Sequence, residues 1–153
     1  MTNLIDTYCG SGLFCLSGAS LFGSCTGIEV NEAAVAEASA NAELNSITNC
    51  KFVSSSAEMI FTDPSVASYN RDSCCVICDP PRKGCSLEYL HQVIDYKPVR
   101  LIYMSCDPSS LARDTKILRD SGVFELTEVQ PFDLFPMTRH IEACAVFERR
   151  GVA

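Results

Sequence analysis

A near-continuous apolar run at residues 74–78, followed at once by Asp79-Pro80-Pro81, constrains the fold of this chain more than any other stretch. A strand that is apolar at every position is typical of the buried middle of a parallel sheet, because helices then cover both of its faces. Two prolines cannot continue a backbone ladder and hold the chain stiffly. The sequence therefore predicts an α/β fold in which Asp79 stands at a strand tip, in a rigid loop.

Strand, turn and helix units alternate along the rest of the chain. Further strands are predicted at residues 4–8, 25–30, 50–53 and 101–104, and helices at 13–21, 32–44, 86–96 and 109–120. On the helix at 86–96, Leu87, Leu90, Val93 and Ile94 indicate the buried face. The stretch 62–73 indicates a surface connection. Two last strands, at 124–132 and 141–147, are joined too closely for a crossover helix, so we expect them to be antiparallel.

A glycine turn, Cys9-Gly10-Ser11-Gly12, follows the first predicted strand. Such a turn lets a ligand approach the backbone where a helix begins. A dinucleotide fingerprint would need a third glycine at position 15, where Cys15 stands. Asp6 with the two glycines is instead typical of an S-adenosylmethionine site, although a plain tight turn gives the same pattern.

Glu29 closes the second predicted strand 17 positions after Gly12. This spacing is close to the ~20 residues expected for the group that holds ribose hydroxyls, so we interpret Glu29 as a ribose ligand. The alternative is a solvated carboxylate or a cap of the next helix, for which Asn31 is the predicted N-cap. Polar residues at 54–58 either bind the edge of an adenine or form a plain loop.

Cys106 lies in the turn Ser105-Cys106-Asp107-Pro108, between a predicted strand and a predicted helix. Side chains at the carboxyl ends of strands meet ligands in α/β sheets. The start of a helix and a nearby cation such as Arg113 both favour the thiolate of a cysteine. The alternative is a buried structural cysteine, which is the commoner state of a free thiol.

Charge and cysteine content limit the function classes. The formal net charge of −7 does not suggest a nucleic-acid binder, so any surface for RNA must be local or lie on a part absent here. The ten cysteines sit inside apolar runs, which favours a reducing compartment. Cys75 and Cys78 form a CxxC pair, but their thiols would point to opposite faces of a strand, so we predict no metal site.

No apolar run approaches the ~20 residues of a membrane span, and Met1-Thr2-Asn3 lacks the basic region of a signal peptide. We therefore expect a soluble, intracellular protein.

Glu142 is polar in an otherwise apolar run, just after a loop that can fold back on the site. A lone glutamate at the start of a strand is usually exposed, so its interpretation depends on its neighbours.

These motifs together resemble the RNA 5-methyluridine methyltransferase family, and specifically the fungal-type tRNA (uracil-5-)-methyltransferases. Adenine amino-methylases carry an aromatic residue after Asp/Asn-Pro-Pro, whereas Arg82 occupies that place here. The family carries Asn more often than Asp at the position of Asp107. The resemblance covers nearly the whole chain and rests on residues 6–14, 27–29, 79–85, 103–108, 112–114 and 133–142.

The resemblance implies a doubly wound, Rossmann-like methyltransferase sheet of about seven strands, mostly parallel with an antiparallel last strand. It implies methyl transfer from S-adenosylmethionine to carbon 5 of an RNA uridine, with tRNA as the expected substrate. Cys106 would add to carbon 6 as the nucleophile, Glu142 would remove the carbon-5 proton, and Asp79 would orient the uracil. The implied cofactor residues are Asp6, Tyr8, Gly10, Gly12, Glu29, Glu58 and Asp79, and the implied RNA contacts are Arg82, Lys83, Arg113, Arg139 and His140.

The chain starts at the first cofactor strand, so we expect residues 1–153 to be a catalytic domain without the N-terminal RNA-binding part and the upstream segment. Such a fragment would bind the cofactor weakly and methylate tRNA poorly or not at all. Two alternatives stay open, because a fold alone does not fix function. One is a methyltransferase with another substrate, and the other is a non-catalytic module. The sequence leaves open the target uridine, the choice between tRNA and ribosomal RNA, the compartment and the oligomeric state.

Overall fold

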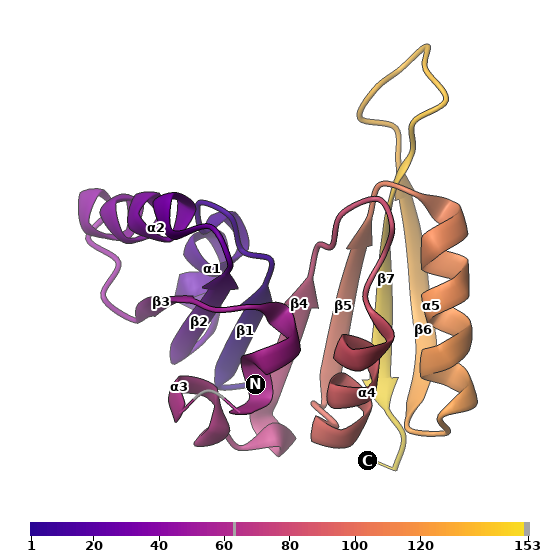
Figure 1. Cartoon of the computed structure of the whole chain (residues 1–153), viewed down its shortest axis with the longest axis horizontal. Coiled ribbons are helices and arrows are strands. Elements are labelled where there is room, and N and C mark those ends of the chain that lie inside the picture. The colour runs from indigo at the N-terminus through magenta and orange to yellow at the C-terminus, as the bar shows by residue number, and fades with distance from the viewer. Residues whose placement is uncertain (63, 152–153) are drawn as a thin grey trace.

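A twisted seven-stranded sheet forms the centre of the computed structural model, which describes residues 1–62 and 64–151 (Figure 1). The strand order is β3-β2-β1-β4-β5-β7-β6. Neighbours among β1 to β5 run parallel, and β7 is antiparallel to both β5 and β6. The strands are β1 (Asn3–Thr7), β2 (Ser24–Glu29), β3 (Cys50–Ser54), β4 (Cys74–Cys78), β5 (Arg100–Ser105), β6 (Phe124–Phe132) and β7 (Glu142–Arg149).

Helices connect the parallel strands, and capping side chains set where three of them begin. Asn31 accepts hydrogen bonds from the N–H groups of Ala33 and Ala34, which confirms it as the N-cap of the helix at 32–44. Asp107 caps the helix after β5 in the same way, with Pro108 in its first turn. The α-helices are α1 (Leu13–Gly18), α2 (Glu32–Leu44), α3 (Pro64–Ala67), α4 (Leu87–Tyr96) and α5 (Pro108–Asp120), and the 3-10 helices are η1 (Ala19–Leu21), η2 (Ala57–Thr62) and η3 (Arg71–Ser73).

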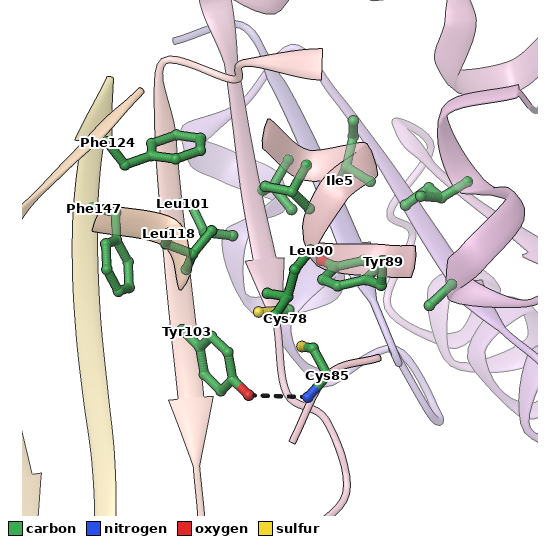
Figure 2. Close-up of a cluster of buried hydrophobic side chains, with 14 of the residues drawn as sticks. Ile5, Cys78, Cys85, Tyr89, Leu90, Leu101, Tyr103, Leu118, Phe124 and Phe147 are labelled. Carbon is green, nitrogen blue, oxygen red and sulfur yellow. Dashed lines mark hydrogen bonds between the residues drawn. The ribbon is translucent and has the colours of Figure 1, made fainter. Parts of the chain in front are cut away.

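Strand β4 is apolar throughout because both of its faces are covered. Val76 and Cys78 belong to a large buried cluster with side chains of α4 and α5 (Figure 2). Cys75 lies on the other face, in a smaller cluster with Cys15 of α1. The predicted α/β sheet is therefore confirmed, and the thiols of Cys75 and Cys78 point away from each other as expected for a strand.

Two local predictions are wrong. The stretch 62–73 is not a plain surface connection, because it contains α3 and η3 and because the Val66 side chain is fully buried. Residue 63 of that stretch lies outside the described residues. Leu87 is 62% exposed, and Tyr89 occupies the buried face of α4 together with Leu90 and Val93. The N-cap Ser86 sets the rotation of this helix, and it leaves Leu87 in the first turn facing outward.

The strand ends that carry the predicted site residues lie at one edge of the sheet. The carboxyl ends of β1, β2, β4 and β5 lie there, and β7 begins there because it runs in the opposite direction. The loop between β6 and β7 extends beyond this edge (Figure 1). Within residues 1–62 and 64–151, no helix has the length and apolar character needed to cross a bilayer.

Candidate active site

A pocket of about 570 Å³ at this edge of the sheet contains the three side chains predicted to do chemistry. Cys106 follows β5, Asp79 follows β4 and Glu142 begins β7. All three line the pocket. The remaining walls are mostly apolar and come from Phe14, Pro80, Pro81, Met104, Phe132 and Leu134.

The antiparallel register explains why Cys106 and Glu142 meet although 35 residues separate them in sequence. Ser105 pairs with Ala143 in the β5–β7 ladder. Continuing that register by one residue places Cys106 opposite Glu142, and opposed residues project to the same face of a sheet. Strand pairing thus places a carboxylate beside the thiol.

The carboxyl groups of Asp79 and Glu142 interact across the pocket. Partial burial raises the pKa of Asp79, and the negative charge of Glu142 raises it further. Asp79 can therefore hold a proton at a higher pH than an ordinary aspartate. Such a group is suited to hydrogen bonding with a polar substrate that enters beside the thiol.

The turn around Cys106 is held by short-range hydrogen bonds. Asp107 accepts from the Ser110 N–H at 2.8 Å, and Ser105 Oγ accepts from the Asp107 N–H at 3.1 Å. The predicted action of Arg113 on the thiol finds no support, because its guanidinium faces elsewhere. Arg113 Nε donates to Asp114 Oδ1 at 2.8 Å, and Nη2 donates to the Lys83 carbonyl at 2.9 Å.

Basic side chains gather on the other side of Cys106, around a second pocket of about 190 Å³ that Arg82, Arg139 and His140 line. Arg82 Nη2 lies 2.7 Å from His140 Nδ1. Because a guanidinium can only donate, His140 Nδ1 is the acceptor in this contact. The role of these residues in binding RNA stays a prediction, as does that of Lys83.

A cleft for a second ligand runs along the ends of β1 and β2. It consists of two adjoining pockets of about 160 and 420 Å³ that share Tyr8, Glu29, Val30 and Glu58. Asp79 lines both the larger of these pockets and the pocket that contains Cys106. The cleft therefore meets the thiol pocket at Asp79, so two ligands bound side by side would touch there.

The glycine turn is joined to the cleft through Glu29, and it packs closely at Gly12. The Gly10 N–H donates to Glu29 Oε2 at 3.1 Å, and the Asn31 N–H donates to Glu29 Oε1 at 2.9 Å. Gly12 has φ +91°, and a Cβ on it would lie 2.9 Å from the ring of Phe52. Only glycine fits there without strain. Glu29 thus fixes the turn and also faces the cleft.

Asp6 contacts helix α1 just after this turn and lines neither pocket of the cleft, and its role as a cofactor ligand stays a prediction. Its side chain is fully buried, and Oδ2 accepts from the Cys15 N–H at 3.3 Å. Burial raises the pKa of Asp6 to about 7. Cys15, which stands where a dinucleotide fingerprint has glycine, is also fully buried and packs against the sheet.

The polar segment after β3 lies along the cleft, where it was predicted to meet an adenine or form a plain loop. Ser55, Ser56 and Glu58 line the smaller pocket. Glu58 Oε1 accepts from Ser86 Oγ at 2.8 Å, which joins η2 to the start of α4. In the described residues, no group of three or more His, Cys, Asp or Glu side chains is arranged to hold a metal ion.

Sequence reasoning missed Asp114 and Tyr103, which form a buried polar pair beneath the site. The available signal was a tyrosine in an apolar strand and an aspartate on the helix that follows Cys106. It also missed the apolar pocket walls, such as Phe14 and Met104. Those side chains come from separate elements, so no local pattern links them.

Comparisons with known proteins agree with this geometry. A sequence model of the family described as tRNA (Uracil-5-)-methyltransferase matches residues 1–150. An uncharacterized RNA methyltransferase of Oceanobacillus iheyensis is 43% identical over 142 residues, which are 93% of this chain and 30% of that protein. One of Listeria innocua is 42% identical over 143 residues, or 94% of this chain and 31% of that protein. The chain thus spans about a third of the length of these relatives.

Solved structures show the same fold. The Pyrococcus abyssi tRNA (uracil-54, C5)-methyltransferase, solved with S-adenosyl-L-homocysteine, superposes with a TM-score of 0.80 at 28% identity, over 96% of this chain and 34% of that one. An rRNA methylase of Streptococcus thermophilus superposes with a TM-score of 0.73 at 18% identity, over 97% of this chain and 86% of that one. The second likeness concerns the fold alone.

Proposed function

Because this chain belongs to the tRNA (uracil-5-)-methyltransferase family, we propose that it is the catalytic part of an S-adenosylmethionine-dependent enzyme that methylates carbon 5 of a uridine in RNA. The observation that carries the proposal is the pocket shared by Cys106, Glu142 and Asp79, which opens onto the cleft beside the glycine turn. Transfer RNA is the expected substrate. Membership of the fungal-type subgroup stays a prediction.

The cleft suits the shape and polarity of the methyl donor. Glu29 is placed to accept ribose hydroxyls, and the backbone at Gly10 is open to a close approach because a Cβ there would have nothing within 4 Å. Ser55, Ser56 and Glu58 line the smaller pocket, where they would face a base. When bound, S-adenosylmethionine supplies an electrophilic methyl group, which carbon 5 of the uracil accepts while the methyl–sulfur bond breaks and its electron pair stays on sulfur. The P. abyssi protein with S-adenosyl-L-homocysteine supports this assignment.

Cys106 supplies the activation that carbon 5 needs. Uracil is a poor carbon nucleophile, so the Cys106 thiolate adds to carbon 6 and the displaced electron pair moves to oxygen 4 as an enolate. Asp79, whose pKa is raised, hydrogen-bonds the ring and holds it beside the thiol. Fixed alignment of the ring, the thiol and the donor in adjoining pockets lowers the barrier further.

Glu142 completes the reaction as the general base. After methylation, carbon 5 carries both its original proton and the methyl group. The Glu142 carboxylate takes the proton, the electron pair forms the C5–C6 double bond, and the C6–sulfur bond breaks to restore the Cys106 thiolate. The position of Glu142 opposite Cys106 in the β5–β7 register supports its assignment to this step.

A loop uridine must leave its stack to reach this pocket. Arg82, Arg139 and His140 surround the mouth beside Cys106, and Lys83 lies at the adjoining cleft. They would contact the phosphates on either side of the extruded nucleotide. Arg113 is a weaker candidate for this role because its hydrogen bonds are made within the protein.

Replacing the nucleophile tests the proposal. We expect Cys106→Ala to abolish formation of 5-methyluridine in unmodified tRNA, measured by mass spectrometry of nucleosides. A 5-fluorouridine RNA should be trapped covalently by the wild type only, because the fluorine cannot leave as the proton does. Cys50→Ala is the matched control, since Cys50 starts β3 at the opposite end of the sheet.

Two results would contradict the proposal. Methylation that survives Cys106→Ala would indicate a methyltransferase with another chemistry. If this chain and a longer protein that contains it both form no adduct and show no heat with S-adenosylmethionine in calorimetry, the chain is a non-catalytic module.

A further inference from the structure

Asp114 is a fully buried carboxylate on α5 to which the mechanism above gives no role. Its Oδ2 accepts from the Tyr103 hydroxyl at 2.6 Å and from the Cys85 N–H at 2.9 Å. Its Oδ1 accepts from Arg113 Nε at 2.8 Å. Every donor to this carboxylate is fixed by the fold, so the charge is paired and hydrogen-bonded, as burial requires.

The same residues hold the backbone of the loop that follows β4. Arg113 Nη2 donates to the carbonyls of Lys83 at 2.9 Å and Cys85 at 3.4 Å. The Cys85 N–H also lies 3.3 Å from the Tyr103 oxygen, as the dashed line in Figure 2 marks. Gly84 has φ +78°, and a Cβ there would lie 2.6 Å from both Asp114 Oδ2 and Arg113 Nη2. The loop therefore packs on these side chains without spare room.

The network joins the two segments that supply the pocket. Tyr103 lies on β5, three residues before Cys106, and α5 starts just after Cys106. The loop on the other side starts at Asp79 and includes Arg82 and Lys83. A change in the network would therefore move Asp79 relative to the thiol, and misplacement by about 1 Å can cost about 100-fold in rate.

We propose that Asp114, with Tyr103 and Arg113, is a positioning device that fixes the loop at 79–85 relative to Cys106. This inference rests on the proposed function. Asp114 is a positioning residue and not a catalytic one, because it acts through the backbone of Lys83 and Cys85 and touches no substrate. The network thereby sets the distance and orientation between Asp79, which orients the uracil, and Cys106, which attacks it.

Limited proteolysis tests whether the network holds the loop at 79–85, and this measurement does not depend on enzymatic activity. Arg82 and Lys83 are exposed, so trypsin can cut there once the loop is released. We expect Tyr103→Phe and Asp114→Asn to raise the rate of cleavage at these two sites by about tenfold or more. Tyr69→Phe is the matched control, since its hydroxyl bonds Ser24 and Thr26 at the far end of the sheet and should leave this rate unchanged.

Adduct formation with a 5-fluorouridine stem-loop tests the positioning. At saturating RNA we expect both network variants to react at least about tenfold more slowly than Tyr69→Phe, at a temperature where thermal melts show all of them folded. A merely structural role would lower the melting temperature and leave this rate unchanged.

Three results would tell a failure of the positioning proposal from a failure of the proposed function. Wild-type cleavage rates in both network variants would overturn the proposal, and so would a released loop with an unchanged adduct rate. If neither the wild-type chain nor a longer protein that contains it forms an adduct, the proposed function fails. The cleavage rates would then still decide whether the network holds the loop.

Discussion

Asp6 and Asp79 carry the same carboxyl group, but the fold gives them different surroundings and different roles. Asp6 is fully buried under the glycine turn, and within the described residues its Oδ1 has no hydrogen-bond partner. Asp79 lies in an open pocket beside Glu142. The pKa is raised in both, mainly by burial. Full burial thus directs Asp6 to a backbone N–H group, whereas partial burial leaves Asp79 available to a substrate.

Asp6 should make the stability of the protein depend on pH. Its pKa is about 7 in the folded state against 3.8 for the ordinary group, so the folded state binds more protons between these values. The stabilisation is complete below about pH 4 and is lost as the pH rises through 7, by a few kcal/mol in total. We expect Asp6→Asn to remove this loss, measured as the free energy of urea unfolding at pH 5 and pH 8. An equal pH dependence in both proteins would contradict the assignment.

The elements around the site owe their placement to how they begin. Helix α5 starts directly after Cys106, and its cap Asp107 bonds the Ser110 N–H. In its first turn, Pro108 has no N–H, and Asp107 accepts the N–H of Ser110 with its side chain and that of Leu111 with its carbonyl. Strand β6 is mostly exposed and includes Pro131, as an edge strand tolerates. The loop between β6 and β7 is in turn free to extend past the sheet, and β7 returns Glu142 to the site.

The cap of α5 gives a prediction at this scale. We expect Asp107→Ala to lower the free energy of unfolding by about 1 kcal/mol, because the Ser110 N–H loses its acceptor. Asp107→Asn should change it by less than about 0.5 kcal/mol, since asparagine caps equally well and is the commoner residue in the family that the sequence resembles. Urea unfolding of the three proteins measures both. If Asp107→Asn lowered the free energy of unfolding as much as Asp107→Ala does, the charge of Asp107 and not its capping hydrogen bond would stabilise the turn.

The molecule as a whole is acidic, with a formal net charge of −7, yet several of its cations lie at one edge. Arg82 and Arg139 line the pocket beside Cys106, and Lys83 lines the adjoining cleft. The chain spans only about a third of its relatives, so further RNA contacts of a longer protein remain part of the proposal.

This charge distribution predicts a weak salt dependence for RNA binding. With about three cations meeting phosphates of a single-stranded loop, log K should fall with log salt at a slope of about −2. Fluorescence anisotropy of a labelled stem-loop in increasing KCl would measure it. A slope steeper than about −4 would place the RNA on cations elsewhere on the surface.

The sequence by itself determined the strands and the longer helices in their order, because the signals for them are local, but it missed α3 and η3. Apolar residues at every position of β4 indicated a strand covered on both faces, and Asn31 fixed the start of α2. The glycine turn, the strand-end position of Glu29 and the thiol between β5 and α5 were also readable, since each depends on a few neighbouring residues.

Only the tertiary structure decided which of these groups meet. The β5–β7 pairing ends at Ser105 and Ala143, and Cys106 and Glu142, the next residues, line one pocket, whereas Asp6 is fully buried. The contacts of Asp114 with Tyr103 and the backbone of Cys85 join a helix, a strand and a loop, and Val66 is buried within the large core cluster. These features depend on contacts between residues far apart in the chain, which no pattern of neighbours along the sequence specifies.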